Sequence, residues 1–156
     1  MHKDNDILDV VAYLFQSCLR DGKLSRDTSK LTKTLQEVGF QKELIYEALA
    51  WLASILQQSE FLVEPTASST RMFNTIECSR LTPECRQFLS RLEEEKILNP
   101  KTREVVIQHM LYLNHRILNA EDAKLVALIV LYGKPEERDK LIKLEQLVFS
   151  NGGIVV

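Results

Sequence analysis

Two pairs of a capping residue followed by proline, Thr82-Pro83 and Asn99-Pro100, constrain the fold of this chain more than any other feature. Threonine and asparagine side chains accept hydrogen bonds from the free amides of a first helical turn. Proline suits the first helical position because its missing N–H is not needed there. A third start, Asn119-Ala-Glu-Asp122, has the same capping residue. The sequence therefore predicts helices over about 83–96 and 100–114, and a third from Asn119 to Tyr132.

Apolar residues elsewhere recur every three or four positions, which indicates further amphipathic helices. The second N-terminal helix ends at Gly39, a natural residue after a helix end, and carries the apolar stripe Leu31, Leu35 and Val38. Helix 119–132 is apolar almost all round, so we expect it at the centre of the C-terminal half. The pattern predicts three N-terminal helices: one over about 6–19, one from Ser25 or Asp27 to Gly39, and one over 41–57. From Thr75 onward it predicts helical structure, which ends in a helix over about 135–149.

Between these helical regions lie two short β-prone runs, which we expect to pair as an antiparallel hairpin of residues 61–65 and 70–74. Three helices followed by a hairpin is the order of a winged helix-turn-helix domain. The predicted fold is mainly α: a winged-helix-like N-terminal half with a small β-hairpin over 1–75, packed on a C-terminal helical bundle over 76–150, with a tail over 151–156. A plain helical bundle with a loop would leave a similar pattern.

The composition favours a protein that works in the cytoplasm without entering a membrane. The longest apolar run, Leu125 to Tyr132, has eight residues, whereas a bilayer-spanning helix needs about 20. The acidic start of the chain is unlike a signal peptide. Three cysteines without metal-finger spacing fit a reduced compartment. The net charge of −2 gives no overall basic excess for nucleic acid.

Metal binding and catalysis have weak support in the sequence. Cys78 and Cys85 are seven residues apart and His109 and His115 six apart, neither of which is the close pair that structural zinc needs. We expect no metal or other cofactor, with buried cysteines and a surface histidine. The run Glu93-Glu-Glu95 is more typical of a solvated helix face than of an acid–base pair. No phosphate-binding glycine loop or activated nucleophile is recognisable, so we assign no catalytic residues and expect a non-enzymatic protein.

A basic stripe formed by Lys23, Arg26, Lys30 and Lys33 is the candidate contact for nucleic acid. In a winged-helix arrangement the helix over 41–57 would be the recognition helix, and its outward face carries Glu43 and Glu47, which repel phosphates. An ordinary solvated face is therefore the favoured interpretation of the stripe.

Arg86, Arg103 and Trp51 are candidate partner-binding residues, because arginine and tryptophan are enriched in interface hot spots. Both arginines lie in a first helical turn, where the helix dipole disfavours a cation. The favoured interpretation is therefore a structural ion pair, with Glu84, Glu104 or a more distant carboxylate. For Trp51 the favoured interpretation is a place in the core.

Several segments, in order along nearly the whole chain, resemble the bacterial Smg family. They are Leu31 to Leu52, Arg71-Met-Phe through Cys78-Ser-Arg-Leu81, Cys85-Arg86, Ile97-Leu-Asn-Pro100, Thr102 to Ile107, and Asp122 to Tyr132. Gln87 and Leu125 depart from the family pattern, which commonly has glycine and tryptophan there, and both departures concern packing.

The resemblance implies no established biochemical activity and no defined catalytic residues. Genes of the family often lie near one for a DNA-processing protein of natural transformation. Our leading hypothesis is a non-enzymatic module that binds another protein, linked to DNA processing. The alternative is weak, direct nucleic-acid binding through the basic stripe and the hairpin. The sequence determines neither the partner, nor the pathway, nor the oligomeric state.

Overall fold

The computed structural model describes residues 6–20, 28–57, 72–113 and 117–150. Within these ranges the chain is mainly helical, as predicted, and no strand is present. The chain divides into two compact units, Met1–Ser54 and Ile55–Val156. The boundary expected from the sequence lay near residue 75, because the expected hairpin was assigned to the N-terminal half.

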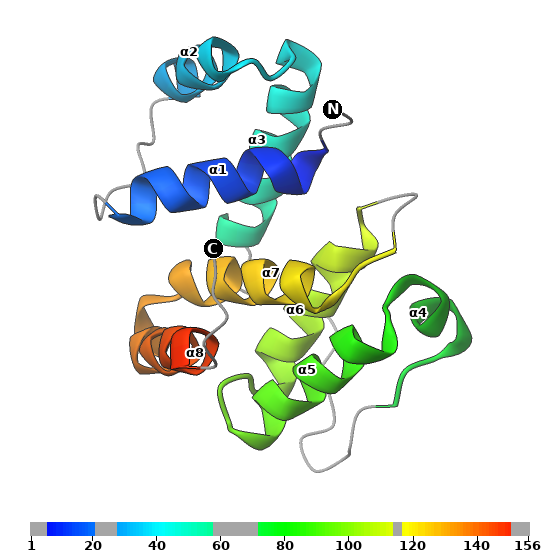
Figure 1. The fold of residues 1–156 in the computed structure, drawn as a ribbon. Coiled ribbons are helices and arrows are strands. Elements are labelled where there is room, and N and C mark those ends of the chain that lie inside the picture. Colours follow the sequence, from blue (N-terminus) through cyan, green and yellow to red (C-terminus); the bar gives the residue numbers. More distant parts are fainter. Residues whose placement is uncertain (1–5, 21–27, 58–71, 114–116, 151–156) are drawn as a thin grey trace. The chain divides into compact units, whose positions relative to one another are not determined.

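The first unit consists of α1 (Ile7–Arg20), α2 (Thr28–Val38) and the larger part of α3 (Lys42–Gln57) (Figure 1). Asp6 caps α1 reciprocally with Asp9: Asp6 Oδ1 accepts from the Asp9 amide at 3.2 Å, and Asp9 Oδ2 accepts from the Asp6 amide at 2.8 Å. The apolar faces of the three helices form the core, which buries Val10, Val11, Leu14, Leu35, Ile45, Ala48 and Leu52.

The corner between α2 and α3 depends on Gly39, whose φ of 121° is accessible to few residues other than glycine. The amides of Gly39 and Phe40 donate to the Gln36 and Leu35 carbonyls at 3.0 and 3.2 Å, which satisfies the end of α2. This confirms the predicted helix end. Val38 differs from its prediction: it is 46% exposed and not part of the apolar stripe, because it lies where the chain turns away from the core.

The second unit contains α4 (Thr75–Arg80), α5 (Pro83–Glu94), α6 (Pro100–Leu111), α7 (Ala120–Tyr132), the 3-10 turn η1 (Pro135–Glu137) and α8 (Arg138–Ser150). As the sequence predicted, α7 is central and packs against α5, α6 and α8 (Figure 1). Its apolar residues are buried on more than one side, including Ala123, Val126, Ala127, Ile129 and Val130.

Three capping boxes fix where α4, α6 and α7 begin. The pairs are Asn74 with Glu77, Asn99 with Thr102, and Asn119 with Asp122. In each pair the asparagine side chain accepts from the amide three residues on, and that later side chain accepts from the asparagine amide. The predicted starts at Asn99 and Asn119 are thereby confirmed, as is the start at Thr82, whose hydroxyl accepts from the Cys85 amide at 3.1 Å.

The predicted hairpin lies almost entirely outside the described residues, which resume at Met72. Residues 72–74 were expected in its second strand, and they form no strand. Asn74 is instead the N-cap of α4, because its side chain and Glu77 satisfy each other's backbone amides. The structure therefore supports the mainly helical fold but not the hairpin.

The end of α5 suggests a stabilising substitution at Lys96. This residue has φ 63°, and the amides of Lys96 and Ile97 donate to the Glu93 and Leu92 carbonyls, the pattern of a Schellman motif. Glycine adopts this conformation without the steric cost that a side chain incurs. We expect Lys96→Gly to raise the free energy of unfolding by about 0.5–1 kcal/mol in urea denaturation. Lys96→Ala removes the same charge but keeps the strained Cβ, so an equal gain from alanine would contradict this explanation.

Candidate interaction surface

Two residues of the predicted basic stripe, Lys30 and Lys33, are exposed on α2. The other two, Lys23 and Arg26, lie outside the described residues. On α3 the residues expected to face outward, including Glu43, Tyr46 and Glu47, are exposed as predicted. The first unit therefore presents exposed carboxylates as well as exposed lysines.

Trp51 is only 2% exposed. The structure thus places Trp51 in the buried interior, where the favoured interpretation of the sequence put it.

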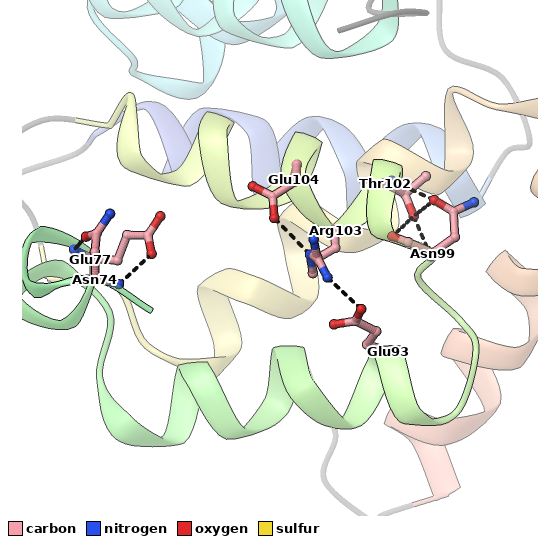
Figure 2. A network of polar contacts seen from close by, with 7 residues as sticks. All are labelled: Asn74, Glu77, Glu93, Asn99, Thr102, Arg103 and Glu104. Carbon is pink, nitrogen blue, oxygen red and sulfur yellow. Dashed lines mark hydrogen bonds and ion pairs between the residues drawn. The ribbon is translucent and has the colours of Figure 1, made fainter. Parts of the chain in front are cut away.

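Arg103 is buried and lies in a partly buried ion-pair network, shown in Figure 2. Its Nη1 is 2.6 Å from Glu93 Oε2 of α5, and its Nε is 2.8 Å from Glu104 Oε2. Both carboxylates lie beside Arg103 near the N-terminus of α6, where negative charge complements the helix dipole that Arg103 alone would oppose. Glu104 was one of the partners that the sequence suggested, and Glu93 is the more distant one. With 5% exposure, Arg103 presents little surface to solvent, and its pair with Glu93 links α6 to α5.

Arg86 is half-buried and makes different contacts from those the sequence suggested. Its Nε donates to the Leu81 carbonyl at 3.2 Å, and its Nη1 donates to Cys78 Sγ at 3.3 Å. Within the described residues it makes no ion pair with a carboxylate, Glu84 included. The side chain thus links the start of α5 to α4.

The cysteines and histidines correct two expectations. Cys78 is exposed, whereas both cysteines were expected to be buried. His109 is buried, whereas a surface histidine was expected: its Nδ1 lies 2.9 Å from the Val105 carbonyl, and burial lowers its pKa below the ordinary value. His115 lies outside the described residues. Over the ranges that the structure describes, no three His, Cys, Asp or Glu side chains gather in a way that could hold a metal ion.

The two cysteines of the second unit should differ sharply in reactivity. Burial raises the pKa of the Cys85 thiol to about 12, with the nearby charge of Asp122 adding to the effect and Arg86 opposing it. The thiolate is the reactive form, so Cys85 should be inert in the folded protein. In a Cys18→Ser background at pH 8, we expect one thiol, Cys78, to react with a thiol-specific chromogenic reagent in native buffer and two to react in denaturant. Labelling of Cys85 in native buffer would contradict its burial.

A cluster of hydrogen bonds around Arg80 joins the connection between α4 and α5 to the connection between α6 and α7. The guanidinium donates to the Leu111 carbonyl at 3.2 Å and to the Leu113 carbonyl, at the C-terminus of α6. The Leu118 amide donates to the Arg80 carbonyl at 2.7 Å, and the Thr82 amide donates to the Leu118 carbonyl at 2.9 Å. These bonds, which we call the Arg80 clasp, place a cation where the dipole of α6 is negative.

Four large apolar side chains on the segments that the Arg80 clasp joins are exposed. Ile76 is four residues before Arg80 and therefore shares its face of α4. Tyr112 lies between the two carbonyls that Arg80 holds, and Ile117 directly precedes Leu118. We call these three residues and Met72 the clasp patch. Their exposed fractions are 81% for Met72, 70% for Ile76, 69% for Tyr112 and 66% for Ile117.

The clasp patch is the surface feature that sequence reasoning missed. Isolated exposed apolar residues are normal, but several gathered at one place commonly mark an interaction site. The sequence pattern does not indicate the clasp patch, because the segments that carry it are joined by contacts between distant residues. Arg80 contacts Leu111 and Leu118, which are 31 and 38 positions later in the chain.

A search of the described residues for a helix long and apolar enough to cross a bilayer found none. The fold and the surface together define a mainly helical protein with two compact units and an apolar patch on the second. The chain belongs to the family described as "Protein of unknown function (DUF494)", whose sequence model matches residues 7–155.

Relatives in several bacteria confirm the resemblance to the Smg family. The chain is 37% identical over 156 residues to "Protein Smg homolog" of Coxiella burnetii (strain Dugway 5J108-111), covering 97% of this chain and 99% of the relative. It is 39% identical over 150 residues to "Protein Smg" of Klebsiella pneumoniae (strain 342) and 38% identical to that of Escherichia coli (strain K12 / DH10B), with 92% of this chain and 96% of the relative covered in both cases. No solved structure matches the chain.

Proposed function

We propose that this chain is a non-enzymatic interaction module that binds another protein through the clasp patch, in a process linked to DNA processing. The observation that carries the proposal is the exposure of Met72, Ile76, Tyr112 and Ile117, which lie on the segments that the Arg80 clasp joins. Aromatic residues and methionine are enriched in protein interfaces, and burying exposed apolar area drives association. The link to DNA processing is carried over from the Smg resemblance.

The Arg80 clasp also supports the proposal. It joins α4 to the end of α6, so the backbone positions that carry Ile76 and Tyr112 are linked to each other before a partner arrives. A preorganised surface loses less conformational entropy on binding. The candidate residues that the sequence offered for partner binding, Arg103 and Trp51, are buried, and the clasp patch takes their place in the proposal.

The proposal is tested by substituting Ile76 with arginine, which places a charge at the centre of the patch. Proteins captured from an extract of the native organism are identified by mass spectrometry, and each is then purified and titrated calorimetrically against the variants. We expect Ile76→Arg to weaken binding about 30-fold or more, as for a hot-spot residue. Ile142→Arg on α8, also at an exposed isoleucine, should bind as the wild type does. Equal binding by all three proteins would refute the patch as the site.

A second candidate, weak nucleic-acid binding, is favoured by the exposure of Lys30 and Lys33 on α2. In this candidate α1–α3 form a winged-helix-like unit, with Lys23 and Arg26 completing the basic stripe. The exposed Glu43 and Glu47 on α3 oppose it, because they would lie beside phosphates.

Salt dependence separates the two candidates. If the stripe binds DNA, glutamine at Arg26, Lys30 and Lys33 should abolish binding, and the wild-type affinity should fall by roughly one log unit per log unit of salt for each phosphate contact. We expect instead that the wild type binds short DNA no more tightly than the roughly 10⁻⁴ to 10⁻⁶ M of non-specific contacts at physiological salt. Submicromolar, charge-dependent binding near physiological salt would favour the second candidate.

A further inference from the structure

Helix α4 buries no apolar side chain, although the structure describes all of its residues. Most of them are exposed, namely Thr75, Ile76, Cys78 and Ser79. Arg80 is half-buried, and the buried residue is the polar Glu77. The other α-helices of the second unit each bury apolar residues, such as Leu89 on α5 and Leu144 on α8. The hydrophobic effect, which packs those helices together, therefore contributes little to the position of α4.

Polar contacts hold α4 in its place instead. The Arg80 guanidinium donates to the Leu111 and Leu113 carbonyls at the end of α6. From α5, Arg86 Nη1 donates to Cys78 Sγ at 3.3 Å. Each hydrogen bond of this kind contributes modestly to stability, because undocking replaces it with a bond to water. The attachment of α4 can thus be exchanged for water without opening the apolar core of the unit.

The chain directly after α4 is fixed in the core. Leu81 is 1% exposed, has an extended backbone and forms a parallel β-bridge with Leu118. The Leu118 amide donates to the Arg80 carbonyl at 2.7 Å, and the Thr82 amide donates to the Leu118 carbonyl at 2.9 Å. These bonds involve the backbone, so they do not depend on the Arg80 side chain. They provide a fixed point at the C-terminal end of α4.

We infer that α4 is a strap, a segment that opens as one unit from the fixed point at Leu81 while α5, α6, α7 and α8 stay folded. Local opening of this kind occurs where little apolar surface is buried. When the strap opens, Ile76 leaves its place beside the end of α6. The segments assigned to the partner are therefore joined only while α4 is docked, and this consequence alone rests on the proposed function.

Hydrogen exchange followed by NMR in the full chain tests the strap. The amides of Cys78 and Leu81 donate to the Asn74 and Glu77 carbonyls at 2.9 and 2.8 Å. A helix of six residues is not stable alone, so undocking exposes these amides to solvent. In the wild type we expect them to exchange at least about 10-fold faster than the most protected amides of α7. Low urea should change their rates little, because opening the strap exposes little surface.

Ile129→Val supplies the decisive comparison. Ile129 is 1% exposed in α7, and losing one buried methylene should speed the exchange of α7 amides that open only with the whole unit about 2- to 10-fold. The Cys78 and Leu81 amides should keep their wild-type rates, because the docked and the open states contain the same core.

Arg80→Met tests the attachment itself. It removes the bonds of the guanidinium and should speed the exchange of the Cys78 and Leu81 amides about 10-fold or more. Arg91→Met, at an exposed arginine of α5, should leave these rates unchanged. The comparison with Ile129→Val does not depend on whether Arg80→Met folds.

The outcomes separate the strap from the proposed function. If Ile129→Val speeds exchange in α4 as much as in α7, α4 opens only with the whole unit and the strap is overturned. Wild-type rates in a folded Arg80→Met variant would also overturn it. Hydrogen exchange needs no partner, so the strap stands even if Ile76→Arg leaves partner binding unchanged, a result that refutes only the proposed function. Weaker partner binding by Ile76→Arg without separate opening of α4 supports the proposed function and refutes the strap.

Discussion

Arg103→Met should destabilise the second unit by about 3 kcal/mol, measured by urea denaturation. Removing one partner of a buried ion pair leaves the opposite charges without compensation, which costs far more than the pair itself contributes. Here two carboxylates, Glu93 and Glu104, would lose the guanidinium that lies 2.6 and 2.8 Å away. They are partly exposed and can hydrate, so we expect the low end of the usual range.

Two further variants make this expectation specific. Lys140→Met breaks the part-buried pair between Lys140 and Glu137 of the same unit, whose cation is 29% exposed against 6% for Arg103, and should cost no more than about 1 kcal/mol. Adding Glu93→Gln to Arg103→Met should restore part of the loss, because it removes one of the uncompensated charges. If Arg103→Met and Lys140→Met cost the same, the network contributes nothing beyond an ordinary surface pair.

Ala127→Asp should abolish cooperative folding of the second unit. Ala127 is fully buried in α7, the helix that packs against α5, α6 and α8. An aspartate there would place a charge in a fully buried position, and burying a charge without a partner costs more than most single substitutions do. We expect a loss of about 4 kcal/mol or more, which is much of the stability of a typical domain. Loss of the cooperative thermal transition would report it.

The same substitution at Ala50 is the matched control. Ala50 lies on the exposed face of α3, so aspartate there can hydrate and costs only its lower helix propensity, about 0.7 kcal/mol. Similar melting curves for Ala127→Asp and Ala50→Asp would show that α7 is not the buried centre of its unit.

Local signals in the sequence predicted most of the helices. A cap is a property of four consecutive residues, so Asn99 with Thr102 and Asn119 with Asp122 could be recognised without knowing what the helices pack against. The glycine at position 39 likewise predicts a helix end by its own conformational freedom. For α7, an apolar surface on every side was sufficient to predict a central position.

Features that depend on contacts between distant residues were not predictable in the same way. His109 and Cys78 were assigned the wrong exposure, because the periodicity of α6 and the shortness of α4 leave the buried face ambiguous. The clasp patch depends on where Arg80 meets the end of α6, more than thirty residues later in the chain. At the start of α4, β-prone residues suggested a strand, and the cap of Asn74 and Glu77 determined the structure instead.

The Arg80 clasp also bears on how long the second unit stays folded. It joins residues 31 and 33 positions apart, so it closes only after α5 and α6 have folded back on each other. Closing so long a loop costs conformational entropy before the hydrogen bonds can form. We therefore expect the clasp to form late in folding. Interactions absent from the transition state slow unfolding and leave the folding rate almost unchanged. We therefore expect the clasp to slow the unfolding of the second unit and to leave its folding rate almost unchanged.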